Sequence, residues 1–111
     1  MQRWQVIHRE GGVLLARPGR MRFDLCAGTE LPPAHPLTVA HEIRKDLWRA
    51  LQRLRGFSPV VAVMPVAGGL RVTAGGQMAA AWPGPQVTER IAALLADPGK
   101  RARWVAHGSI R

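Results

Sequence analysis

The segment from Pro36 to Arg55, PLTVAHEIRKDLWRALQRLR, carries the longest helical pattern in the chain and constrains the fold most. At ~100° of turn per residue, its apolar residues fall in one arc of roughly 120°. We therefore expect an amphipathic helix that lies across an antiparallel sheet and ends at Gly56. The apolar arc consists of Val39, Ile43, Leu47, Ala50, Leu51 and Leu54.

The opposite face of this helix is basic. Trp48 lies on that polar side, where a large aromatic ring can stack on a nucleobase or bury in a partner. Glu42 and Asp46 are each followed three residues later by a basic residue, so we interpret them as members of surface ion pairs rather than as a catalytic pair. The polar residues around Trp48 are His41, Arg44, Lys45, Arg49, Gln52, Arg53 and Arg55.

The whole chain, like this helix face, carries an excess of basic residues. Sixteen Lys and Arg residues face seven Asp and Glu residues, for a net charge of +9. The codon usage of a GC-rich bacterial genome accounts for fourteen Arg against two Lys, but not for the excess of bases over acids. Arginine binds phosphate through a planar fork, so the excess predicts a polyanionic partner.

The N-terminal quarter shows the alternation of β-strands. We predict strands over 3–9, 13–17 and 21–26, joined by turns at Glu10-Gly11-Gly12 and at 17–20, as a three-stranded meander. Three prolines in 27–36 predict a loop. The chain is one domain, with a hairpin over 1–19 and an α+β core over 20–111.

After the long helix, the pattern predicts a strand over 60–66, a turn at Gly68-Gly69 and a strand over 70–74 that Gly75-Gly76 ends. A rigid turn at Trp82–Pro85, a helix over 86–96 and a strand over 100–107 follow. The element order from Met21 resembles the ferredoxin-like βαββαβ arrangement, with an RNase H-like fold as the alternative. The tight hairpin at Gly68-Gly69 disfavours that alternative, and element order alone says little about function.

The outward positions of the predicted central strands are a second basic candidate. Arg22, Arg71 and Arg103 form a stripe on the open face of the predicted sheet. That face carries no aromatic residue, which disfavours the base-stacking mode of RNA-recognition domains.

Candidates for metal or catalytic chemistry are weak. Cys26, His35 and His41 lack the short paired spacing of zinc ligands, and an isolated cysteine is more often a small buried apolar residue. No glycine motif for a phosphate loop or a dinucleotide is present. We expect no metal, no cofactor and no enzymatic activity.

We therefore predict a nucleic-acid-binding protein with little sequence preference. Its binding residues would be Arg44, Lys45, Trp48, Arg49, Gln52, Arg53 and Arg55. The alternative is an assembly component, either a homodimer or a binder of an acidic protein, in which Trp48 packs under the hairpin or at an interface. The lack of a membrane-span-length apolar run and of a signal peptide, with a single cysteine, indicates a cytoplasmic protein that does not enter a membrane.

Overall fold

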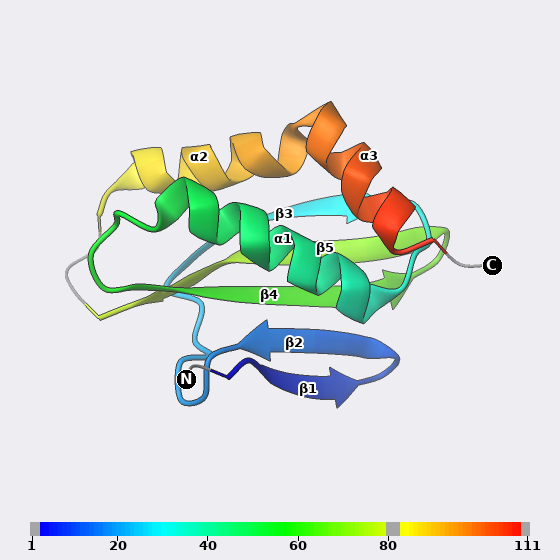
Figure 1. The fold of residues 1–111 in the computed structure, drawn as a ribbon, viewed down its shortest axis with the longest axis horizontal. Coiled ribbons are helices and arrows are strands. Elements are labelled where there is room, and N and C mark those ends of the chain that lie inside the picture. The colour runs from blue at the N-terminus through cyan, green and yellow to red at the C-terminus, as the bar shows by residue number, and fades with distance from the viewer. Residues whose placement is uncertain (1–2, 80–82, 110–111) are drawn as a thin grey trace.

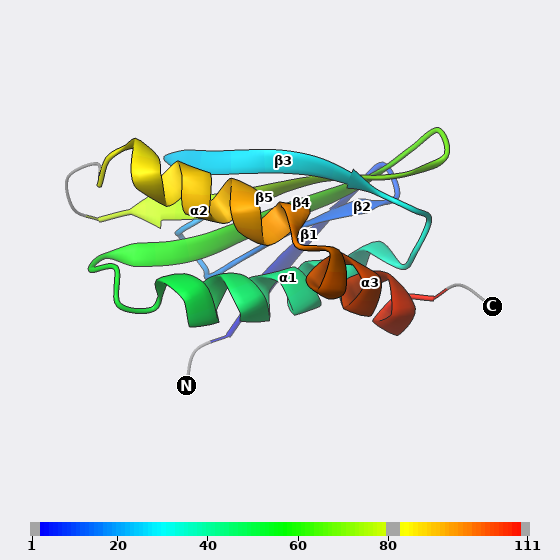
Figure 2. The same ribbon diagram turned by 90° about the horizontal axis from the view of Figure 1, so that it is seen from above.

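The computed structural model describes residues 3–79 and 83–109. In these residues an antiparallel sheet of five strands, in the order β1-β2-β4-β5-β3, is covered on one face by three helices (Figures 1 and 2). The predicted α+β class is confirmed. No helix in the described part of the chain is long and apolar enough to span a membrane.

The N-terminal hairpin extends the sheet. Strand β1 (Gln5–Arg9) pairs with β2 (Gly12–Ala16), and the turn residues Glu10 and Gly11 have φ values of 54° and 81°. Two successive positive φ values are typical of the type I′ turn, whose twist matches that of the strands it joins. The predicted hairpin is confirmed, but the meander is wrong because β2 pairs with β4.

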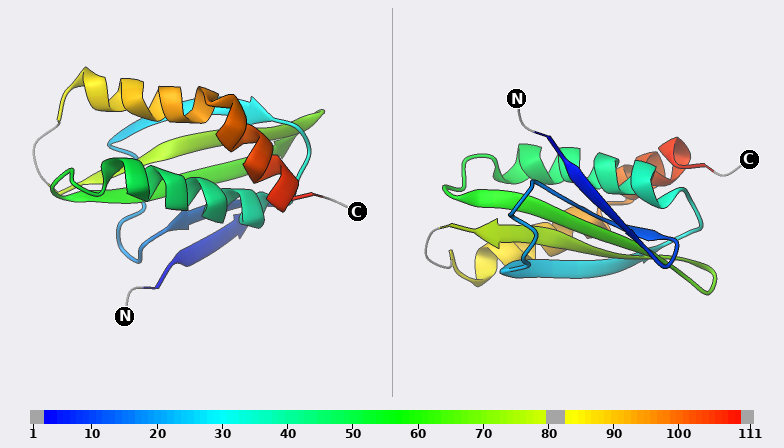
Figure 3. Two further views of the ribbon diagram at one scale, coloured as in Figure 1. Left: turned by 45° about the horizontal axis from the view of Figure 1, so that its top comes forward. Right: turned by 90° about the horizontal axis from the view of Figure 1, so that it is seen from below.

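Strand β3 (Leu25–Leu31) lies at the opposite edge and begins later than 21–26, so the predicted loop over 27–36 is wrong in its first half. The preceding segment, 17–24, crosses the sheet on the face away from the helices (Figures 1 and 3). Asp24 ends this crossing: its backbone N–H donates to Gly76 O at 2.9 Å, and its carboxylate accepts from Met78 N at 2.7 Å. The crossing places β3 against β5 rather than against β2.

The central elements match their predicted positions but differ in length. Helix α1 spans Pro36–Leu51 and ends four residues before Arg55. Strands β4 (Phe57–Val66) and β5 (Gly69–Met78) are longer than predicted. Gly75 lies within β5 rather than at its end. The neighbouring strand β3 runs so close there that a Cβ on residue 75 would collide with the carbonyl oxygen of Leu25, so the position requires glycine.

The C-terminal prediction of a strand over 100–107 is wrong. Helix α2 (Pro85–Ala96) is followed directly by helix α3 (Pro98–His107). Asp97 ends the first helix and caps the second, since its side chain accepts a hydrogen bond from Lys100 N at 2.9 Å. The fourth strand of the predicted ferredoxin-like order is therefore a helix, and the predicted turn at Trp82 lies outside the described residues.

The core lies between the sheet and the helical layer. Helix α1 packs on β4 and β2, α2 on β3, and α3 on α1. Ile43 and Leu47 are fully buried, as predicted, whereas Ala50 is exposed and Leu54 is half-buried. The same buried core cluster includes Leu25, Val61, Val63, Leu70 and Val72 from the sheet.

Candidate polyanion-binding site

Neighbouring elements divide the polar face of α1 into two flanks. At ~100° per residue, Arg44 and Trp48 lie on the flank toward the N-terminal hairpin, and Asp46 on the flank toward α2 and α3. Arg53 follows the end of α1 and lies on the same side as Arg90 of α2. Lys45 lies between the two flanks and faces solvent. The single basic surface predicted from the sequence is therefore two surfaces, separated by the width of the helix.

A buried carboxylate organises the flank toward α3. Asp46 is only 4% exposed and accepts a hydrogen bond from Trp104 Nε1 at 2.7 Å. It also accepts from Arg49 at 2.9 Å and from Arg103. A buried carboxylate with these charged and neutral donors is well satisfied, so Asp46 joins α1 to α3 and holds the two arginines beside it.

A cavity of about 520 Å³ opens over this carboxylate. Its charged lining comes from all three helices: Arg49 on α1, Arg90 on α2, and Lys100 and Arg103 on α3. An adjoining cavity of about 360 Å³ shares Arg49 and Arg90 and adds Gln52 and Arg53. We call these two cavities together the helical groove.

The helical groove carries an excess of positive charge. Arg90 donates to the carbonyl oxygen of Ala50 at 2.6 Å, in the last turn of α1, which aims its guanidinium along the groove. Lys100 lies 3.6 Å from Asp97 Oδ2. Asp46 is the one carboxylate among the described lining residues, and five cations line the two cavities: Arg49, Arg53, Arg90, Lys100 and Arg103.

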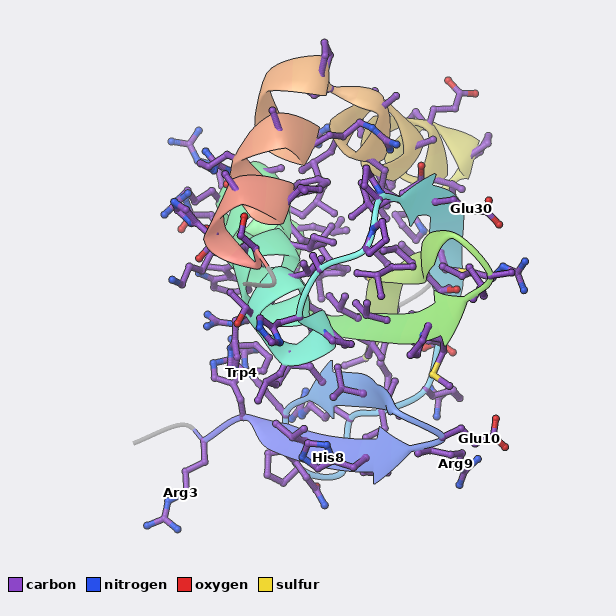
Figure 4. All side chains as sticks on the ribbon, turned by 90° about the vertical axis from the view of Figure 1, so that its right-hand side faces the viewer. Arg3, Trp4, His8, Arg9, Glu10 and Glu30 are labelled. Carbon is purple, nitrogen blue, oxygen red and sulfur yellow. The ribbon has the colours of Figure 1, made fainter. Side chains whose placement is uncertain are left out.

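On the other flank, Trp48 is half-buried rather than exposed. The Arg17 guanidinium lies 4.9 Å from the centre of the Trp48 ring and 5.1 Å from that of Trp4. Arg44 lies 4.6 Å from the Trp4 ring. Trp4 extends from the start of the hairpin toward α1 (Figure 4), so these four side chains, which we call the stacked cluster, attach the hairpin to the helix.

The electrostatics of the stacked cluster are unfavourable to positive charge. Burial, and next the charge of Arg20, lowers the pKa of Arg17. Burial, followed by the nearby charge of Arg17, lowers the pKa of Arg44. The pKa of His41 is lowered by burial and then by Arg44 and Lys45, and His41 Nδ1 lies 3.1 Å from an Arg44 nitrogen.

The ion pair predicted for Glu42 is confirmed and extended. Glu42 accepts from Lys45 at 3.1 Å and lies 2.7 Å from Nδ1 of His107, at the end of α3. Partial burial alone would raise the pKa of Glu42, but the hydrogen bonds from His107 and Lys45 outweigh it and lower the pKa. Both oxygens of this carboxylate are thus engaged away from the stacked cluster.

The predicted basic stripe on the sheet does not form. Arg103 lies on α3, Arg22 pairs with Asp24 at 2.6 Å, and Arg71 pairs with Glu30 at 3.2 Å. Arg103 reaches the helical groove because 100–107 is a helix rather than a strand. Its neighbour Arg101 points the other way and donates to Thr29 Oγ1 and Glu30 O on β3, at 2.7 and 2.6 Å.

The weak metal candidates lie on separate elements. Cys26 is exposed on β3, His35 precedes α1 and His41 lies within α1. Over residues 3–79 and 83–109, no group of three or more His, Cys, Asp and Glu side chains is arranged to hold a metal ion.

Comparisons with protein-family models, curated proteins and solved structures give no match to this chain. Its function must therefore be inferred from its own geometry.

Sequence reasoning missed several residues of both surfaces. Arg90 and Lys100 were not among the residues expected to lie beside α1. The local signal that predicts α3 is Asp97-Pro98, an N-cap residue followed by proline at the first helical position. No local signal pairs Arg17 with Trp48, because that contact depends on the sheet order.

Proposed function

We propose that this protein binds nucleic acid through its phosphate backbone, with the helical groove as the main contact surface. The observation that carries the proposal is the convergence of four cations from three helices on a cavity over one buried, fully engaged carboxylate, with a fifth cation, Arg53, in the adjoining cavity. A phosphodiester backbone is the common polyanion in a cell, and arginine forks suit its oxygens.

The chemistry of the groove favours backbone contacts over base contacts. The lining combines guanidinium and ammonium groups with apolar side chains such as Ala50 and Leu94, and none of its described residues carries an aromatic ring. Contacts of this kind position a strand without specifying its sequence, which supports binding with little sequence preference. Of the residues predicted from the sequence, the groove retains Arg49, Gln52 and Arg53.

Trp48 has a different role in this proposal. Because Arg17 already lies over its ring, a base that stacked on the same face of Trp48 would have to displace the Arg17 guanidinium. We assign Trp48 to the attachment of the hairpin. Arg44 belongs to the stacked cluster, while Lys45 and Arg55 are exposed and outside the described lining of the groove.

The test measures the affinity of a labelled oligonucleotide, single-stranded and duplex, as a function of salt by fluorescence anisotropy. Each lost phosphate contact should lower the slope of log affinity against log salt by roughly 0.7–0.9. A triple variant, Arg49→Gln, Arg90→Gln and Lys100→Gln, should therefore lower the slope by roughly two to three units.

The matched control is a triple variant with the same change in charge, Arg9→Gln, Arg22→Gln and Arg71→Gln, whose sites are exposed and outside the groove. It should leave the slope nearly unchanged. Equal losses in both triple variants would show that net charge alone drives binding, and the groove would lose its role. Undetectable wild-type binding at ~50 mM salt would end the proposal.

The second candidate is an assembly component, and the sheet supports it. On the face away from the helices, Ile7, Leu14 and Ala62 form one cross-strand row of half-buried apolar residues. The strands β1 and β3 are also at the sheet edges. A mass that rises with protein concentration, and is unaffected by the groove variants, would favour self-association through this sheet.

A further inference from the structure

The stacked cluster contains two arginines without an acidic partner. In the described residues, no carboxylate accepts a hydrogen bond from Arg17 or Arg44, and the single side-chain partner of Arg44 is His41. The Nε atoms of both arginines are buried and have no hydrogen-bond partner. Every other α1 cation within the helix, Lys45 and Arg49, pairs with a carboxylate.

The groups that face this cluster do not neutralise it. The hairpin supplies Trp4 and Arg17, with Arg20 close enough to lower the pKa of Arg17. Helix α1 supplies His41, Arg44 and Trp48. The charge of its nearest acid, Glu42, favours the charged form of Arg44 but is outweighed by burial and by Arg17, so the pKa of Arg44 is still lowered. The Glu42 carboxylate is itself engaged by Lys45 and His107. Both guanidinium groups thus lie against the Trp4 ring. Aromatic rings attract cations but do not cancel their charge.

We propose that Arg17 and Arg44 form a binding site for a phosphate oxyanion where the N-terminal hairpin packs on α1. A phosphate group supplies several acceptor oxygens and a charge that offsets both guanidiniums. Stacking on Trp4 and Trp48 holds the planes of the two forks in place before the anion arrives, which lowers the conformational entropy lost on binding.

This site is separate from the helical groove and does not depend on it. The two lie on opposite flanks of α1, about one helix diameter apart, roughly 10 Å. The phosphate at Arg17 and Arg44 can belong to a free phosphate compound or to a polynucleotide that crosses α1. The shared chemistry is the phosphate oxyanion.

The test titrates inorganic phosphate into the full chain at constant ionic strength and follows the arginine Nε–H signals by ¹H–¹⁵N NMR. The signals of Arg17 and Arg44 should shift and saturate together, while that of Arg55, an exposed arginine outside both sites, should not. Arg44→Gln should weaken the binding followed at Arg17 about tenfold, as expected for one charge-assisted hydrogen bond. Arg55→Gln, which removes the same charge, should leave it unchanged.

A phosphate response spread evenly over all arginines without saturation would overturn the site, and this result needs no variant to fold. An unchanged affinity in a folded Arg44→Gln variant would overturn it as well. A short oligonucleotide that shifts the Arg17 signal identifies a backbone phosphate, whereas a response to inorganic phosphate alone identifies a free phosphate compound. Loss of oligonucleotide binding in the groove variants with the phosphate response intact would separate the two proposals.

Discussion

The two flanks of α1 hold their arginines in different ways. On the α3 flank, Arg49 and Arg103 are held by the buried carboxylate of Asp46. On the hairpin flank, Arg17 and Arg44 are held by the rings of Trp4 and Trp48. Both arrangements join a neighbouring element to the same helix, but only the first supplies a negative charge.

The comparison shows that the positive charge available to an anion depends on how each cation is held as well as on the number of cations. A carboxylate orients a cation and cancels much of its field, so the helical groove depends on further cations, Arg53 and Arg90, for its excess charge. Aromatic rings orient an arginine and leave its charge uncompensated. We therefore expect the two flanks to respond differently to substitution.

Removal of Asp46 should have the largest effect. Asp46→Ala leaves the Trp104 indole N–H and two arginines without their acceptor, and should lower the free energy of unfolding by about 3–5 kcal/mol. Denaturant unfolding measures this loss. Glu30→Ala, which removes the exposed ion pair with Arg71, is the control and should cost less than about 1 kcal/mol. Similar losses in the two variants would show that Asp46 does not join α1 to α3.

Leu47 lies in the core beneath both flanks and is fully buried. Leu47→Ala should lower the free energy of unfolding by about 2–5 kcal/mol, the range for a truncated core leucine. Leu37→Ala, at an exposed site on the same helix, should change it little. A loss below about 1 kcal/mol at Leu47 would contradict the assignment of the core face.

The hairpin flank should show a smaller coupling. A double-mutant cycle of Arg17→Gln and Trp48→Leu isolates the contact between the guanidinium and the ring, because leucine keeps the apolar packing. The coupling energy should be about 0.5–2 kcal/mol. A cycle of Arg20→Gln with Trp48→Leu is the matched control, and a coupling there of equal size would argue against a specific stack.

The smallest effect should be a pH dependence at His41. Burial and the charges of Arg44 and Lys45 place the folded pKa of His41 below its ordinary value of 6.5. The folded state then binds fewer protons than the unfolded state, so stability is complete above pH 6.5 and falls as the pH drops through the folded pKa. His41→Gln should remove this part of the decline, as measured by thermal unfolding between pH 7 and 5. Parallel profiles of thermal stability against pH in the parent protein and the variant would contradict this role of His41.

Further acidification should weaken the protein through carboxylates. The pKa values of Asp24 and Asp97 are lowered, by the Arg22 hydrogen bond and by the Lys100 backbone N–H, respectively. Their contribution is present above their ordinary pKa of 3.8 and is lost as the pH falls through the lower folded values. This stage lies below the pH range of His41, so the two can be measured separately.

Local patterns were sufficient for many elements. Apolar residues at helical spacing predict α1 with Ile43 and Leu47 inside, and the Glu10-Gly11 turn predicts the first hairpin. They failed where one residue has two roles. Asp97 was interpreted as the end of α2, but its side chain also caps the N-terminus of α3. Gly75 was interpreted as the end of a strand, but its missing side chain lets β5 continue close beside β3.

By itself, the sequence determined the α+β class, the amphipathic helix at the centre and a charge that suits a polyanion, because these depend on residue spacing and composition. Tertiary structure alone decided which cations share a surface. Strand β2 pairs with β4, on which α1 packs, so the hairpin lies beside α1 and Arg17 meets Trp48. The turn at Asp97 folds α3 against α1, so Arg103 and Lys100 meet Arg49. Contacts between residues far apart in sequence depend on strand order and helix packing, which no local pattern encodes.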